Sequence, residues 1–409
     1  MAASHQTNCT SNSAVLYVAL EMGMANWKVC STVGVAQKPR SRTVTARRMD
    51  LVLAEINRAK ARFGLPTDAV VHVCYEAGRD GFWAYRWLTQ QGLNTVVVDS
   101  SSIEVNRRKR RAKTDRLDGE KLALMLARYQ QGEQRLWSVV QVPSLEEEDA
   151  RQLHRELKAL RGERTEHTNR IKGRLIGVGI EWKGSTSGFP ARLAEFRLWW
   201  ETQTDAGGAP LPAGLRERLR REYERLVVVE RQIEELEDQR DRVIGQGEGA
   251  RVDKVRRLMD LHGIGATAAW ILVLEFFAWR TFRNRREVGS LSGLTPAPYD
   301  SGGSERSQGI SKAGNRLVRV LMVQLAWGWL RFQPQSALSR WYRERFGRGS
   351  KRQRKIGIVA LARKLIVALW RYLETGVPPE GAVKSDWRNK IPKRFQRTST
   401  ETPAMAQVA

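Results

Sequence analysis

Short apolar runs rich in β-branched residues alternate with segments of helical periodicity over residues 14–143. The runs at residues 15–20 (VLYVAL) and 27–33 (WKVCSTV) flank a Met-Gly-Met-Ala-Asn turn, a pattern that predicts a β-hairpin. Two further runs, at residues 69–75 and 95–99, predict buried strands. Helical periodicity covers residues 49–63, 81–91 and 114–129. A hairpin followed by strand, helix and strand predicts an α/β domain with a central mixed sheet.

The composition changes near residue 144, where Glu, Arg, Leu and Gln become frequent. Residues 144–176 and 214–243 contain no Pro and carry Leu, Ile or Val at helical spacing. This pattern predicts two long helices that form an antiparallel hairpin or coiled coil. Separate amphipathic helices of a bundle are the alternative. We expect residues 144–250 to form a helical linker region of this kind.

The last third of the chain predicts a mainly α-helical domain over residues 251–376. Two helical segments surround Gly263-Ile264-Gly265, and a Gly- and Ser-rich stretch at residues 290–309 predicts a loop. Further helices are expected at residues 312–332 and 355–374. Residues 377–409 are basic and then polar, which predicts a disordered tail.

The net charge narrows the classes of partner. The 409 residues include 70 Lys and Arg against 44 Asp and Glu, a formal net charge of +26. Such an excess of base predicts a polyanionic partner, with nucleic acid first and an anionic membrane surface as the alternative. The membrane alternative weakens because no apolar run approaches the roughly 18 residues of a spanning helix. The longest run, residues 268–279, is interrupted by Glu275.

Cysteine usage and the N-terminal residues indicate a cytoplasmic protein. Cys9, Cys30 and Cys74 lie far apart and have no neighbouring His, so neither a disulfide framework nor a zinc site is predicted. No Lys or Arg precedes the first apolar stretch, so the pattern of a secretory signal is not met. We therefore expect a chain that works in the cytoplasm, with no membrane partner.

Carboxylates lie where two predicted strands end and where a helix begins. Glu21 follows the first strand, Glu76 follows a later one, and Asp115 and Asp118 start a helix. The two Asp residues are three positions apart and therefore share one helix face. Four converging carboxylates suit Mg²⁺, which prefers oxygen ligands, and predict a two-metal site that acts on phosphodiesters. A solvated loop position is the alternative for each acid, and a helix cap for Asp115.

A basic strip leads directly into these acids. Its six cations are Arg107, Arg108, Lys109, Arg110, Arg111 and Lys113. We predict that the strip holds the phosphate backbone of a nucleic acid beside the metal ligands. A solvated run of surface charge is the alternative.

Residues 261–269 (LHGIGATAA) predict a helix, a tight turn and a second helix. Gly263 and Gly265 permit the turn, and the second helix then offers its free backbone amides to a phosphate. The arrangement resembles a helix-hairpin-helix, which binds nucleic-acid backbone. A simple helical hairpin is the alternative. Lys312 and Arg316, at helical spacing further along the chain, are candidates for neighbouring phosphate contacts.

Residues 112–119 (AKTDRLDG) resemble the KTDxxDA signature of the DEDD transposases of bacterial insertion sequences. Residues 75–78 (YEAG) resemble the second acidic motif of that family. The first motif corresponds to residues 20–23 (LEMG), where Glu21 stands in place of the usual Asp. The resemblance implies a RuvC-like, ribonuclease H-type fold for residues 14–143. It also implies that Glu21, Glu76, Asp115 and Asp118 are the catalytic acids that hold Mg²⁺.

A second block of resemblance lies in the last third of the chain. Residues 293–303 (GLTPAPYDSGG) and 309–316 (GISKAGNR) are similar to the C-terminal transposase domain of the same family. That resemblance implies that Ser301 is the nucleophile that attacks DNA. From the residues alone, a serine beside two glycines is usually a turn residue. No His lies near Ser301 in the sequence, so a Ser-His-Asp hydrolase is poorly supported.

The resemblance as a whole implies an RNA-guided DNA transposase or recombinase. A bridge RNA would pair with donor and target DNA, and the protein would cleave and rejoin the strands. The family also implies a homo-oligomer, a dimer that assembles to a tetramer through the coiled coil, acting at the nucleoid. One subunit's acids would then meet another's serine. Two alternatives stay open: a metal-only nuclease that cuts structured DNA such as Holliday junctions, and a non-catalytic nucleic-acid-binding protein.

Overall fold

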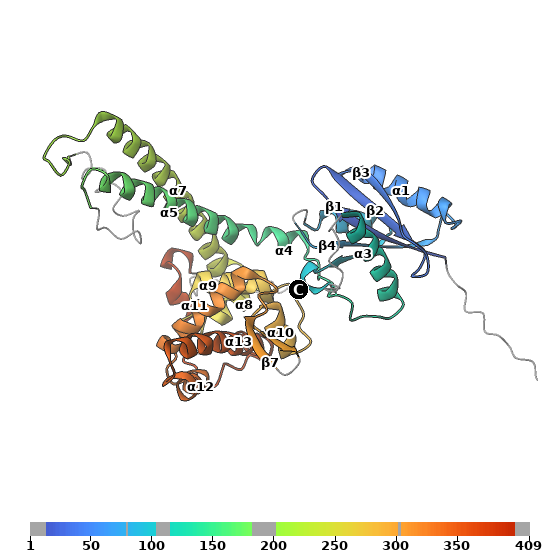
Figure 1. Ribbon diagram of the computed structural model, residues 1–409. Coiled ribbons are helices and arrows are strands. Elements are labelled where there is room, and N and C mark those ends of the chain that lie inside the picture. Colours follow the sequence, from blue (N-terminus) through green and yellow to red (C-terminus); the bar gives the residue numbers. More distant parts are fainter. Residues whose placement is uncertain (1–13, 79–80, 104–114, 182–201, 302–303, 397–409) are drawn as a thin grey trace, which may run out of the picture. The chain divides into compact units, whose positions relative to one another are not determined.

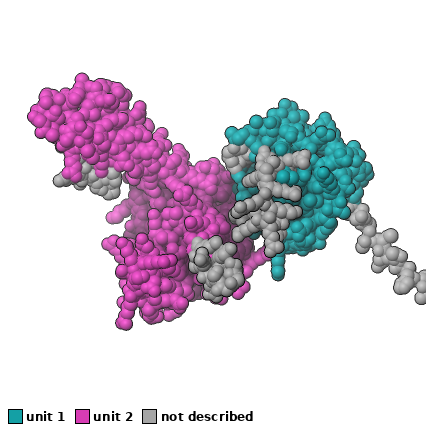
Figure 2. All heavy atoms as spheres, in the orientation of Figure 1, with its two compact units in different colours: residues 1–142 teal, residues 143–409 magenta. Residues whose placement is uncertain are grey.

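The computed structural model describes residues 14–78, 81–103, 115–181, 202–301 and 304–396. The chain divides into two compact units, residues 1–142 and 143–409, which Figure 2 shows in teal and magenta. Each unit has its own hydrophobic core. Within the described residues, every helix is too short or too polar to cross a lipid bilayer.

The first unit is built on a five-stranded mixed sheet in the order β3-β2-β1-β4-β5. Its strands are β1 (Val15–Met22), β2 (Asn26–Thr32), β3 (Arg40–Thr45), β4 (Val70–Glu76) and β5 (Asn94–Val98). The first three strands are antiparallel neighbours, whereas β4 pairs in parallel with both β1 and β5. The predicted hairpin and mixed sheet are confirmed. The sequence did not predict β3, because this mostly exposed edge strand (RSRTVT) lacks an apolar run.

Helices cover both faces of this sheet, as the alternation of side chains along the strands requires. On one face, Leu16, Val18 and Leu20 of β1 join the core formed with α1 (Met49–Arg62) and α2 (Trp83–Gln90). On the other face, Ala19 of β1 and Cys74 of β4 pack against α3 (Asp115–Gln130). All three helices were predicted, and the sheet lies between the α1/α2 layer and α3 (Figure 1).

The second unit begins with a helical arm. A capping box at Ser144 starts the short helix α4 (Leu145–Asp149). The long helices α5 (Gln152–Ile176) and α7 (Ala213–Gln246) then pack side by side (Figure 1). They run antiparallel, since Leu157 near the start of α5 packs with Ile233 near the end of α7. Towards the tip of the arm, Leu175 at the end of α5 packs with Leu215. The two predicted long helices are confirmed.

The rest of the second unit is a helical bundle around one large core. Its elements are α8 (Ala250–Met259), α9 (Ala266–Leu272), the π-helix η2 (Val273–Phe277), α10 (Arg285–Leu291), α11 (Arg316–Phe332), α12 (Ala337–Phe346) and α13 (Lys351–Thr375). Leu258, Phe276, Met322 and Leu365 are among the fully buried residues of this core. A mainly α-helical C-terminal part was predicted and is confirmed.

The predicted loop at residues 290–309 is wrong. This stretch contains the end of α10 and a two-stranded antiparallel sheet of β6 (Pro296–Ser301) and β7 (Ser304–Ile310). The Gly, Ser and Pro residues of this stretch are atypical of strands, because Pro296 and Pro298 provide no N–H for the hydrogen bonds between strands. A register shift between these two prolines accommodates them.

The predicted disorder of residues 377–409 is wrong for residues 377–396. This segment carries two short 3₁₀ helices, η3 (Trp387–Lys390) and η4 (Lys393–Phe395). Ile391 and Phe395 are buried in the main core of the second unit. The isolated apolar residues in a basic stretch gave no periodic signal, yet they anchor the segment. Residues 397–409 lie outside the described residues.

Candidate functional site

Two of the predicted acids meet at one end of the first unit's sheet. Parallel pairing of β1 with β4 places Leu20 opposite Tyr75, so Glu21 and Glu76 follow at the same end. Side chains alternate along a strand, which puts Glu21 on the face of Ala19 and Glu76 on the face of Cys74. Both acids line a cavity of about 260 Å³ together with Met22, Ala77, Gly78 and Gly81.

Helix α3 brings the other two acids to this end of the sheet. The helix begins at Asp115, of which only the backbone is described, and Asp118 lies one turn later. The next residue, Gly119, lies directly on the sheet. A Cβ built at Gly119 would be 2.7 Å from the Cys30 Sγ and 3.6 Å from the Glu21 Cβ. Glycine therefore permits a close approach that places the first turn of α3 beside Glu21.

The donor set at this site fits Mg²⁺ better than a transition metal. It consists of carboxylates, whereas the two cysteines behind it are buried and unmodified. Burial raises the pKa of the Cys74 thiol, and the charge of Glu76 raises it further. Cys74 is therefore a neutral thiol of the core, and it is not among the residues that line the cavity with the two acids. Among the described side chains no three such groups are close enough to hold an ion alone, but Mg²⁺ needs only one or two carboxylates beside water and phosphate.

The basic strip lies outside the described residues. Arg107, Arg108, Lys109, Arg110, Arg111 and Lys113 all belong to it. Their role in phosphate binding stays a prediction.

In the second unit, the predicted tight turn between two helices is present. It connects α8 to α9, and Gly263 adopts a φ of +90°, which favours glycine. A Cβ on Gly263 would lie 2.8 Å from the Phe332 Cβ, so packing also requires a glycine here. Gly265 is the N-cap residue of α9, and a Cβ built on it would have no neighbouring atom within 4 Å. The Lys390 Nζ donates hydrogen bonds to the carbonyl oxygens of Leu261 (2.9 Å) and Ile264 (3.1 Å).

Ser301 is the last residue of β6 and pairs with Ser304 of β7 across the hairpin. Its backbone alone is described, and Gly302 lies outside the described residues. The strand thus presents Ser301 at the tip of a hairpin.

The helix predicted at residues 312–332 begins four residues later, at Arg316. Lys312 does not share a helix with Arg316, because its φ of +56° places it in the preceding turn. Helix α11 begins at Arg316 and is capped by Asn315, whose Oδ1 accepts hydrogen bonds from two backbone N–H groups. The Arg319 Nη1 donates a hydrogen bond to the Lys312 carbonyl oxygen at 2.8 Å, which fixes this turn.

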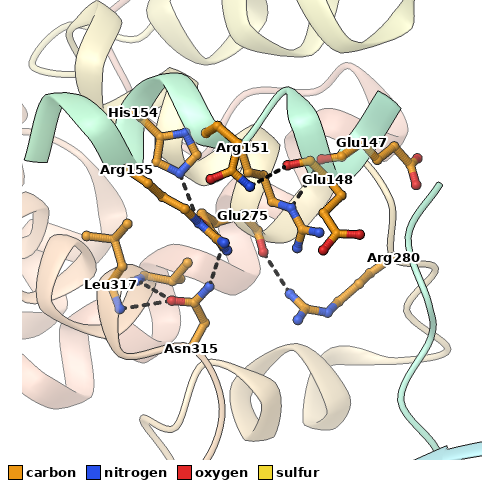
Figure 3. Close-up of polar contacts among 11 residues, drawn as sticks. Glu147, Glu148, Arg151, His154, Arg155, Glu275, Arg280, Asn315 and Leu317 are labelled. Atoms are coloured by element: carbon orange, nitrogen blue, oxygen red, sulfur yellow. Dashed lines mark hydrogen bonds and ion pairs between the residues drawn. The ribbon is translucent and has the colours of Figure 1, made fainter. Parts of the chain in front are cut away.

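A buried carboxylate, Glu275, connects the arm to the N-terminus of α11 (Figure 3). Glu275 lies on the π-helix η2, and its side chain is 3% exposed. Its oxygens bind the His154 Nε2 (2.8 Å) and accept hydrogen bonds from the Arg155 Nε (2.8 Å) and the Asn315 Nδ2 (2.8 Å). Sequence reasoning assigned Glu275 no role, although an acid within the longest apolar run was a signal that it is buried and paired.

Electrostatics explains why Glu275 is tolerated in the core. Burial alone would raise the pKa of Glu275, but the hydrogen bonds from His154 and Arg155 outweigh burial and lower the pKa to about 2. Nearby, burial lowers the pKa of Arg280 to about 10, so this arginine still carries its charge at neutral pH. Its guanidinium lies 3.9 Å from the centre of the Trp279 ring and donates to the Glu275 carbonyl oxygen.

Comparison with known proteins identifies the chain's relatives. Residues 255–342 match the family described as "Transposase IS116/IS110/IS902 family". Over 381 residues the chain is 40% identical to the "Putative transposase y4rJ" of Sinorhizobium fredii, a match that covers 90% of this chain and 94% of the relative. It is 30% identical over 236 residues to the "Probable family 20 transposase" of Pseudomonas aeruginosa, covering 57% and 66%. It is 29% identical over 220 residues to the "Transposase for insertion sequence element IS1328" of Yersinia enterocolitica, covering 53% and 60%.

The first of these matches covers 90% of the chain and therefore spans both units. With 40% identity along nearly the whole length of that relative, the chain belongs to the IS116/IS110/IS902 family of transposases.

Proposed function

We propose that this insertion-sequence transposase is an RNA-guided recombinase that cleaves and rejoins donor and target DNA. Membership of the family supports transposition as the activity. The observation that carries the chemical part is the parallel pairing of β1 with β4, which puts Glu21 and Glu76 on one cavity beside the first turn of α3. Such a sheet with acids at one end supports the RuvC-like assignment.

In this proposal Glu21, Glu76, Asp115 and Asp118 hold Mg²⁺. When bound, Mg²⁺ would neutralise charge on the phosphodiester and orient its oxygens. The protein's own part is to hold the carboxylates at the end of the sheet. Parallel pairing of β1 and β4 fixes Glu21 and Glu76, and the contact of Gly119 with β1 and β2 fixes Asp118.

Ser301 is the proposed nucleophile. Its Oγ forms a bond to phosphorus, the bond from phosphorus to one deoxyribose oxygen breaks, and that oxygen leaves as a hydroxyl after taking up a proton. The proton of the serine hydroxyl passes to a neighbouring carboxylate. The resulting phosphoserine ester conserves the energy of the phosphodiester, so the freed hydroxyl of another strand can reverse the step and rejoin the DNA.

The nucleic-acid contacts of this proposal lie on both units. The strip at residues 107–113 would hold backbone beside the acids, and Gly263, Gly265, Lys312 and Arg316 would contact phosphates in the second unit. A bridge RNA would choose the donor and target sequences by base pairing. We further propose a homo-oligomer, a dimer that assembles to a tetramer through the α5–α7 arm, acting on DNA in the nucleoid.

A covalent-trapping experiment tests the proposal. The purified protein is mixed with its flanking RNA, donor DNA, target DNA and Mg²⁺, quenched in detergent, and examined for protein joined to DNA. We expect an adduct that is lost in Ser301→Ala and in Asp118→Ala. Matched controls, Ser304→Ala across the hairpin and Glu133→Gln in the turn after α3, should retain it. Nicked DNA without an adduct, still produced by Ser301→Ala, would overturn the serine mechanism in favour of a metal-only nuclease.

A further inference from the structure

A long groove in the second unit carries positive charge that the proposed chemistry does not use. The groove has a volume of about 1330 Å³ and lies along α10 and α13, with α12 and residues 377–380 at its other side. We call it the α10–α13 groove. Its cations are Arg285, Arg286, Arg363, Lys364 and Arg371. We propose that this groove binds the phosphate backbone of a DNA duplex that flanks the cleavage site, an inference that rests on the proposed function.

The charges of the groove are not neutralised by the described part of the protein. Among the described lining residues the single carboxylate is that of Glu380, which lies 3.4 Å from Arg340. Arg285, Arg286 and Arg371 are exposed, and no described carboxylate pairs with them. A cluster of unpaired cations in a concave surface raises the local concentration of a polyanion.

The arm of the same unit shows the opposite pattern. There, many arginines are paired with carboxylates, as in Arg174 with Glu222 (3.1 Å) and Arg220 with Glu224 (2.5 Å). On the arm, these ion pairs use the charge of the arginines to stabilise the two helices. The cations of the groove do not stabilise their helix in this way, because Arg285 and Arg286 occupy the first turn of α10, where the helix dipole disfavours cations.

The geometry of α13 fits the spacing of a DNA strand. Lys364, Ala368, Arg371 and Thr375 lie four, three and four residues apart, so they form one stripe of the helix along the groove. The seven residues from Lys364 to Arg371 span roughly 10 Å along the helix axis. Phosphates of one strand follow each other every 3.4 Å along the axis of B-DNA, so this stripe is long enough to contact more than one phosphate of a strand. Apolar side chains such as Leu338 and Val367 form the floor, against which sugars can pack.

The position of the groove favours DNA as its occupant. Thr295, which lines the groove, directly precedes β6, the strand that ends at Ser301. Six residues of extended strand reach at most about 20 Å. At 3.4 Å per base pair, the end of the groove at Thr295 would hold backbone within about six base pairs of the phosphodiester that Ser301 attacks. The groove would thereby hold the duplex beside the break while strands are exchanged.

Salt dependence of binding tests this site without any cleavage. Binding of a random-sequence DNA duplex is measured over a salt series without Mg²⁺, on a Ser301→Ala background, so the result is independent of the catalytic proposal. The groove variant is Arg285→Ala/Arg286→Ala/Arg371→Ala. Its control, Lys158→Ala/Arg218→Ala/Arg231→Ala, removes the same charge from exposed positions of the arm. The slope of log K against log salt is negative. We expect its magnitude to decrease by about 0.9 for each lost phosphate contact, hence by about 2 to 3 in the groove variant.

The control variant should keep the slope of the parent protein. Equal losses in both triple variants would show that only net charge matters and would overturn the groove. A loss seen with an RNA duplex of the same sequence but not with DNA would also overturn it. The single variant Arg371→Gln, at an exposed position, should decrease the magnitude of the slope by about 0.9. An unchanged slope in this variant would count against the site.

Discussion

At the scale of single residues, Glu275 makes the stability of the second unit depend on pH. Its pKa is about 2 in the folded protein, against an ordinary value of 4.5. A lowered pKa means that its contribution to stability is complete above pH 4.5 and is lost as the pH falls towards 2. The shift corresponds to about 3 kcal/mol. We expect Glu275→Gln to be less stable than the wild type by about that amount at neutral pH, since it leaves Arg155 without its partner.

Urea unfolding at a series of pH values, followed by tryptophan fluorescence, measures this difference. The gap between wild type and Glu275→Gln should narrow steadily from pH 4.5 downwards, because the wild type then loses the charge that the variant lacks. Glu237→Gln is the matched control, since Glu237 makes a partly exposed pair with Arg161 across the arm and should matter by less than about 1 kcal/mol. A gap that stays constant with pH would show that Glu275 is not the ionised partner described above.

Gly119 offers a second prediction at this scale, at the acidic end of the sheet. Gly119→Ala would place a Cβ 2.7 Å from the Cys30 Sγ, an overlap that typically costs about 1 to 3 kcal/mol. Adding Cys30→Ala removes the sulfur, and the double variant should recover most of the loss, helped by the better helix propensity of Ala. Thermal unfolding of the four proteins measures the coupling. Strictly additive effects would mean that the close contact is not the reason for glycine.

How far these residues could be predicted depends on the distance over which each one acts. Glu21 is the penultimate residue of β1 and Glu76 is the last residue of β4, whereas the strand pattern predicted that both follow their strands. The pattern therefore placed both acids at sheet ends, and only the strand order was needed to join them. Glu275 could not be placed in this way, because its partner His154 is 121 residues away in the sequence. The spacing of residues along one helix or strand says nothing about such a pair.

At the scale of elements, the sequence predicted helices and strands reliably where apolar residues repeat regularly. It predicted the exposed or irregular strands poorly. Long helices such as α7 and α13 repeat their apolar positions many times, so the pattern outweighs local exceptions. The strands β3, β6 and β7 are exposed, short or rich in Gly and Pro, and their stability comes from pairing with a neighbour. The anchored C-terminal segment has only scattered apolar residues, whose burial depends on the bundle that they meet.

That segment leads to a prediction about an element. Deletion of residues 378–409 should destabilise the second unit by about 4 kcal/mol, the order expected for losing two buried apolar side chains, Ile391 and Phe395. It also removes the hydrogen bonds between Val383 and Gln333. Deletion of residues 397–409 alone is the control and should leave the urea midpoint unchanged. Equal midpoints for both deletions would show that the packed segment adds nothing to stability.

At the scale of the whole molecule, the proposed metal-binding acids and the proposed nucleophile lie in different units. The acids belong to residues 1–142 and Ser301 to residues 143–409, each in a unit with its own core. Either set can therefore be inactivated without unfolding the other. This separation makes it possible to ask whether acids and serine act within one chain or between the chains of the proposed oligomer.

Mixing two inactive variants answers that question. Asp118→Ala and Ser301→Ala should each fail to form the covalent adduct alone. If the acids of one subunit act with the serine of another, random pairing makes half of the dimers mixed, and each mixed dimer has one intact pair of acids and serine. The adduct should then return to about a quarter of the wild-type amount. If acids and serine act within one chain, every pair in a mixed dimer lacks one component, and no adduct forms. The measurement is the trapping experiment on proteins mixed before assembly, with wild type diluted in Ser301→Ala as the reference for pairing.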